Sequence, residues 1–103
     1  ILIITKSMKD VMCLYEMGIP AISPSSESTF IPNDVLEHLK KRFKRIIIMF
    51  DRDEAGVKYL RKMSQKKGLE GMLVHKRFKA KDISDAIKAN GFEKVKNWLT
   101  KQL

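Results

Sequence analysis

The sequence is poor in cysteine and in acidic residues, and it has no long apolar run. Its single cysteine, Cys13, has no partner for an internal disulfide, which fits a reducing compartment. Its apolar runs, such as residues 46–50, fall far short of the roughly 20 residues that a membrane-spanning helix needs. No charged and then apolar leader opens the chain, so nothing marks secretion. We therefore expect a cytoplasmic protein without a membrane partner.

The chain has 103 residues and an apolar fraction of 44%, which predicts one folded domain with one core. It starts at Ile1, directly in an apolar run, so we expect a domain excised from a larger protein. The 21 Lys and Arg against 12 Asp and Glu give a net charge of +9. Such a balance favours polyanionic partners, DNA or RNA, through phosphate neutralisation and counterion release. A solvated surface of Lys-rich helices would give the same balance.

Short apolar runs alternate with amphipathic segments along the whole chain. A continuous apolar run is typical of a strand that is buried on both faces. The expected strands cover residues 1–4, 20–23, 46–50 and 72–74. The expected helices follow Ser7, follow Asn33 or Asp34, cover residues 54–67 and 83–89, and start again near Phe92. This alternation predicts an α/β fold with three α/β/α layers, Rossmann-like, around a four-stranded parallel sheet.

The first expected helix carries two local signals. Ser7 and Asp10 match a capping box, in which each side chain accepts a hydrogen bond from the other residue's backbone N–H. Met8, Val11, Met12 and Tyr15 recur at the spacing of one helical face.

The sharpest chemical feature is the pair Asp51 and Asp53, directly after the strongest strand. In an extended segment these two side chains point the same way, and ligands of open parallel sheets gather at the carboxyl ends of strands. Two converging carboxylates suit Mg²⁺, completed by phosphates and water. Gly56 in the next turn permits close backbone approach. Alternatively, Asp53 only caps the helix and Asp51 is a solvated strand end.

Further charged residues follow the second and fourth strands, at the same end of the sheet. Glu27 lies in a Ser-rich loop and is a possible extra carboxylate, although a solvated loop residue would look the same. Asp82 is another, and at a helix start it would also suit the helix dipole. A cationic group beside carboxylates is what a phosphate-handling site needs, with a plain solvated turn as the alternative. This group comprises Lys76, Arg77, Lys79 and Lys81.

Three segments together resemble the TOPRIM family, the metal-binding catalytic module shared by primases and topoisomerases. They are LIITKSMKDVMCLYEMGIPAIS, IIIMFDRDEAG and KAKDISDAI. The last resembles a segment of phage-type primases and primase-helicases. The resemblance implies that residues 1–103 form a single TOPRIM-like domain that uses Mg²⁺ or Mn²⁺ in nucleotidyl transfer during DNA replication. It also implies DNA or RNA and nucleotides as partners, flanking domains such as a helicase, and a bacterial or phage-infected cell.

One position departs from that family. With Lys9 and Asp10 aligned to the family's Lys-Asp pair, Lys6 stands where the family has a glutamate, its proposed general acid or base. Lys6, Asp51 and Asp53 are therefore the candidate catalytic residues, with Lys6 pairing an aspartate or a phosphate. The alternative is a catalytically degenerate module that binds nucleic acid or partner proteins. A phosphatase with Asp51 as nucleophile is a third possibility. We expect the chain alone to be inactive in primer synthesis.

Overall fold

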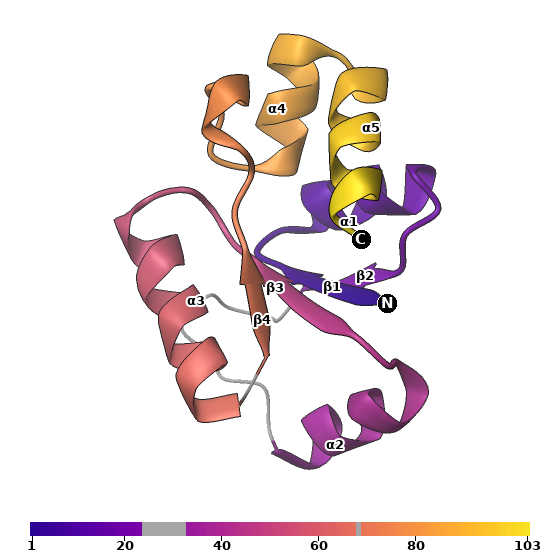
Figure 1. Cartoon of the computed structure of the whole chain (residues 1–103), viewed down its shortest axis with the longest axis vertical. Helices are drawn as coiled ribbons and strands as arrows, with labels where there is room; N and C mark the ends of the chain where they lie inside the picture. Colours follow the sequence, from indigo (N-terminus) through magenta and orange to yellow (C-terminus); the bar gives the residue numbers. More distant parts are fainter. Residues whose placement is uncertain (24–32, 68) are drawn as a thin grey trace.

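The computed structural model describes residues 1–23, 33–67 and 69–103. Within them a four-stranded, all-parallel sheet has the strand order β2-β1-β3-β4 (Figure 1). The strands are β1 (Leu2–Thr5), β2 (Ala21–Ile22), β3 (Ile46–Met49) and β4 (Glu70–Met72). The helices are α1 (Met8–Glu16), α2 (Asn33–Arg42), α3 (Glu54–Lys67), α4 (Ile83–Asn90) and α5 (Phe92–Gln102), with a 3₁₀ turn η1 (Lys76–Phe78) before α4.

The two central strands explain why the sheet forms here. Every residue of β1 and β3 is buried, and the two strands pair along their full length from Leu2 opposite Ile46. Neighbouring side chains of a strand point to opposite faces. Ile3 accordingly joins the core beneath α1, α4 and α5, whereas Ile4 joins the core beneath α2 and α3. Figure 1 shows these two groups of helices on opposite sides of the sheet, so the predicted three-layer α/β/α fold is confirmed.

The fourth strand lies two residues earlier than predicted. Glu70, Gly71 and Met72 pair with β3, while Val74 is buried beyond the end of the strand. Gly71 lies within this strand, and a methyl group there would overlap the Leu60 side chain of α3. The absence of a side chain at Gly71 therefore lets α3 pack closely on β4.

The structure of helix α1 differs from both sequence predictions, the capping box and the apolar face. Ser7 does cap the helix, since its hydroxyl accepts a hydrogen bond from the Asp10 amide at 3.4 Å. The Asp10 carboxylate, however, accepts from Thr5 and from the Ser84 amide instead of closing a capping box. The stripe was also wrong, because Val11 is buried together with Leu14. Its other three members are exposed: Met8, Met12 and Tyr15.

Two apolar stripes overlap on α1, and local periodicity does not choose between them. The sheet selects the stripe of Val11 and Leu14, and this rotation also turns Asp10 inwards, towards α4. No helix in the described part of the chain is both long enough and apolar enough to cross a membrane.

Candidate metal centre

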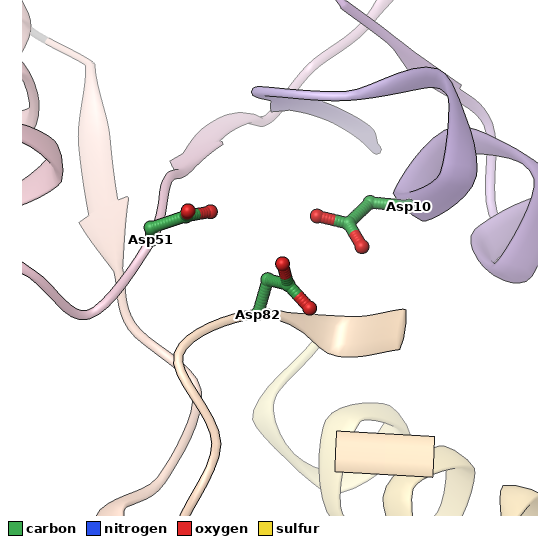
Figure 2. A group of neighbouring side chains, drawn as sticks. All are labelled: Asp10, Asp51 and Asp82. Atoms are coloured by element: carbon green, nitrogen blue, oxygen red, sulfur yellow. The ribbon is translucent and has the colours of Figure 1, made fainter. Parts of the chain in front are cut away.

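Three aspartates from separate parts of the chain point towards one another at the carboxyl end of the sheet (Figure 2). Asp10 comes from the first turn of α1, Asp51 follows β3, and Asp82 is the N-cap of α4. One carboxylate oxygen from each lies within 4.8 Å of the other two. The parallel sheet causes this meeting, because it delivers successive strand ends to one edge.

Asp51 is a buried member of the group and is 3% exposed. The Lys6 ammonium lies 3.4 Å from its Oδ2, which confirms the predicted closeness of Lys6 to the motif. Burial raises the pKa of Asp51, the Lys6 charge and hydrogen bond oppose that rise, and the nearby carboxylates of Asp82 and Asp53 add to it. Asp51 is thus a carboxylate that a neighbouring cation stabilises in its charged form.

Asp10 is also buried, at 2% exposed, and two hydrogen bonds hold its carboxylate in place. Its Oδ2 accepts from the Thr5 hydroxyl at 3.2 Å, and its Oδ1 accepts from the Ser84 amide at 3.0 Å. Burial raises the pKa of Asp10; the hydrogen bonds oppose that rise, and the charge of Asp82 adds to it. The bond to Ser84 ties α1 directly to α4 across the site.

Asp82 and Asp53 both cap helices but differ in position. Asp82 Oδ1 accepts from the Asp85 amide at 2.8 Å and from the Ser84 hydroxyl at 3.1 Å. Asp53 Oδ1 accepts from the Gly56 amide at 2.8 Å, at the start of α3. Among the described residues, Asp53 is not a member of the three-carboxylate group. The structure therefore joins Asp51 to Asp10 and Asp82, whereas Asp53 takes the capping position that was its alternative.

Gly56 has the role expected of it. A methyl group there would overlap the backbone carbonyl of Asp51. The first turn of α3 can therefore lie against the end of β3 only because this residue has no side chain. The spacing of Asp51, Asp53 and Gly56 is thus a packing requirement as well as a chemical motif.

Arg52 connects the end of β3 to the segment between β4 and α4. Its amide donates to the Lys81 carbonyl at 2.7 Å, and its Nε donates to the Val74 carbonyl at 2.7 Å. Both ends of the connection between β4 and α4 are thereby fastened to the residue next to Asp51. This fixes Asp82, which follows Lys81, relative to Asp51.

Two of the three carboxylates, those of Asp51 and Asp82, line a cleft of about 440 Å³. Three lysines line it together with Asp51 and Asp82, and they are Lys6, Lys9 and Lys81. Carboxylates within reach of one ion, surrounded by cations, form an arrangement that can hold a divalent metal and the phosphates bound to it.

The four predicted phosphate-binding cations do not act as one group. Lys81 lines the carboxylate cleft, whereas Arg77 lines a different cavity beside α5. Lys76 and Lys79 line neither of these two cavities. Glu27 lies outside the described residues. The phosphate-binding role of these cations stays a prediction.

Sequence reasoning missed Asp10 as a site residue, because its position fitted a capping box. A better signal was available in the Lys9-Asp10 pair, which was aligned with the family but used only to set the register. Asp82 was named only as a possible additional acid, although it is one of the three.

The donor set fits a hard divalent cation. Mg²⁺ prefers carboxylate oxygens and keeps several waters or phosphates of its own. Asp10, Asp51 and Asp82 would hold it. The Lys6 ammonium on Asp51 would compete with the ion for that carboxylate, which favours weak binding.

Comparison with known protein families agrees with this geometry. The model of a family described as Toprim-like matches residues 3–87, from β1 into α4. The chain has no significant match among the curated proteins or the solved structures with which it was compared. Toprim-like domains are modules of nucleic-acid metabolism and generally bind Mg²⁺. The matched stretch contains every aspartate of the metal centre and most of the chain, and the protein therefore belongs to the Toprim-like family.

Proposed function

We propose that this domain is the metal-binding catalytic module of a DNA primase or primase-helicase. The observation that carries the proposal is the set of three carboxylate oxygens within 4.8 Å at the carboxyl end of the sheet. Nucleotidyl transfer needs phosphates to be held and their charge to be offset, and this cleft combines oxygen ligands with lysines. The flanking domains, a helicase partner, and the cytoplasm of a bacterial or phage-infected cell remain predictions.

The residues of the chain would share the work as follows. Asp10, Asp51 and Asp82 would hold Mg²⁺ or Mn²⁺, which supplies charge neutralisation at phosphate oxygens when bound. Lys9 and Lys81 line the cleft as exposed cations and would bind phosphates as point charges. Arg52 keeps Asp51 and Asp82 at a fixed spacing through its two hydrogen bonds.

A second candidate function is a module that binds nucleic acid or a partner protein without catalysis. The specific observation is Lys6, whose ammonium lies 3.4 Å from Asp51 in the position where the family has a glutamate. A protonated lysine neither binds a metal nor accepts a proton. The two functions differ in whether metal binding is linked to turnover.

Metal binding is tested by Mn²⁺-induced broadening of backbone amide NMR signals. We expect broadening centred on residues near Asp10, Asp51 and Asp82, and its loss in Asp51→Asn and Asp82→Asn. Asp53→Asn is the matched control, because asparagine also caps helices and Asp53 lies outside the group. Loss of broadening in Asp53→Asn, together with its retention in Asp82→Asn, would return the site to the original Asp51 and Asp53 pair.

Catalysis is tested by primer synthesis on a single-stranded template with Mg²⁺ or Mn²⁺. The isolated chain should be inactive, because template, nucleotides and metal must be held together and the described residues form one sheet with its covering helices. The same chain within its full-length parent should be active, and Asp51→Asn should abolish that activity. An active parent that tolerates Asp51→Asn would favour the non-catalytic module.

A further inference from the structure

A second cavity, of about 530 Å³, lies between η1 and α5. Its lining contains three cations, three amides and two aromatic rings, and among the described residues that line it none is acidic. They are Arg77, Phe78, Asn90, Lys94, Asn97, Trp98, Lys101 and Gln102. The helix α5, which supplies most of them, lies beyond the part of the chain that the family model matches.

The floor of this cavity is rigid. Phe78 and Trp98 are 4% and 8% exposed, and their rings pack edge to face with centroids 5.5 Å apart. The Asn90 amide nitrogen donates to the Phe78 carbonyl at 2.9 Å and to the Ala86 carbonyl at 3.1 Å, which joins η1 to α4. The Arg77 guanidinium lies 5.0 Å from the centre of the Phe78 ring. The cavity is therefore formed before any ligand arrives.

One face of α5 forms the facing wall. Lys94, Asn97, Trp98 and Lys101 follow the helical spacing i, i+3, i+4 and i+7. The two lysines and Asn97 are exposed around the buried Trp98. Cationic and amide donors around a small hollow match the phosphate and sugar oxygens of a nucleic-acid backbone.

We infer that this cavity binds the sugar-phosphate backbone of single-stranded nucleic acid. A hollow of this volume accepts about one or two nucleotides, whereas a duplex needs a broad, open surface. The choice of nucleic acid over another polyanion rests on the proposed function, and the position of the cavity supports it. Helix α4 starts at the carboxylate cleft with Asp82 and ends at the cavity with Asn90, about 12 Å along its axis.

The connection between β4 and α4 joins the two places. Lys81 at its end lines the carboxylate cleft, and Arg77 in its middle lines the cavity. A strand whose phosphate lies at the carboxylates can therefore pass over this connection and reach α5. The cavity would hold the strand beside the site, outside the metal centre itself.

The test is fluorescence anisotropy of a short, labelled oligothymidylate at low salt in the presence of EDTA. Lys94→Ala/Lys101→Ala should weaken binding roughly tenfold and lower the slope of log K against log salt by about 1.4. The matched control is Lys41→Ala/Lys62→Ala, which removes the same charge from exposed positions of α2 and α3 on the other face of the sheet. Circular dichroism checks that both variants are folded.

Equal weakening in both variants would overturn the inference, because net charge alone would then explain binding. So would equal affinity for a duplex, or displacement of the oligonucleotide by a poly-glutamate peptide at equal charge. Asp51→Asn separates this inference from the proposed function. It removes Mn²⁺ broadening if the metal centre is real, and, because it takes a negative charge away, it should not weaken the binding of the strand in EDTA.

Discussion

The carboxylate cleft and the cavity beside α5 are built in opposite ways. The three aspartates come from three elements, and Asp10 and Asp51 are almost fully buried. The cations of the cavity are exposed, and two of them belong to a single helix face. Burial raises the pKa values of Asp10 and Asp51, so charge in the cleft opposes the fold, while charge at the cavity remains solvated. Substitutions in the cleft should therefore change stability and chemistry together, whereas substitutions at the cavity should change binding alone.

The largest effect is expected from Gly56→Ala, which should destabilise the fold by about 3 kcal/mol or more. Its methyl group would overlap the Asp51 carbonyl, and backbone cannot give way as a flexible side chain can. Urea unfolding measures the change. Ala55→Ser, at an exposed position of the same turn, should stay within about 0.5 kcal/mol. A Gly56→Ala protein as stable as the original would mean that α3 does not pack against Asp51 in this way.

Next in size is Lys6→Glu, which should tighten Mn²⁺ binding roughly tenfold by adding an oxygen ligand and removing a competing charge. Isothermal titration calorimetry measures the affinity. Lys9→Glu is the control, because it makes the same charge change at an exposed position of the same cleft. It should have a clearly smaller effect. Equal gains in both variants would show that the overall field of the cleft, rather than the contact with Asp51, decides affinity.

Asp10→Asn sharpens the comparison through pH. The folded pKa of Asp10 is raised, so its stabilising contribution is present below its ordinary value of 3.8 and is lost as pH rises through the folded pKa. Without metal, Asp10→Asn should therefore be more stable than the original protein at neutral pH, by about 1 kcal/mol. The difference should vanish in acid, where the aspartate is protonated as well. Thermal unfolding at both pH values checks this, and a constant difference would contradict it.

The smallest effect on stability is expected from a substitution at Lys79, which lies in the segment between the two regions. Lys79 has a φ of 52°, in the left-handed region that glycine adopts without strain. Lys79→Gly should stabilise the protein by about 0.5 kcal/mol and leave oligonucleotide binding unchanged, because Lys79 lines neither cavity. Lys88→Gly, inside α4, should destabilise the protein by about 1 kcal/mol. Weaker oligonucleotide binding in Lys79→Gly would show that the nucleic-acid-binding surface extends beyond the cavity to Lys79.

Much of the fold could be predicted because its signals are local. The β1 and β3 strands are continuous apolar runs, and the order of strands and helices implied a parallel sheet with helices on both faces. The edge strands were harder. In β4 the strand pairs through Glu70, Gly71 and Met72, and Gly71 lies against Leu60 of α3, a contact that nothing near Gly71 in the sequence indicates.

The site was predicted only in part, for a similar reason. Asp51 could be found because it follows the strongest strand. Asp10 could not, because a polar residue in a first helical turn has an adequate local explanation. Its true partners are Thr5 and Ser84, and the contact with Ser84 exists only once α4 is packed beside α1. A local pattern therefore assigned Asp10 to a helix cap, although its role depends on a contact that is distant in the sequence.

Arg52 has a mechanical consequence for the two regions. Its hydrogen bonds to the carbonyls of Val74 and Lys81 fix both ends of the segment between β4 and α4. Both ends of this segment are therefore fixed, and Asp82 directly follows the fixed residue Lys81. The spacing of Asp51 and Asp82 should therefore stay constant when a strand binds in the neighbouring cavity. Arg52, through its backbone amide and its guanidinium, would thereby keep the geometry of the metal centre independent of what the cavity holds.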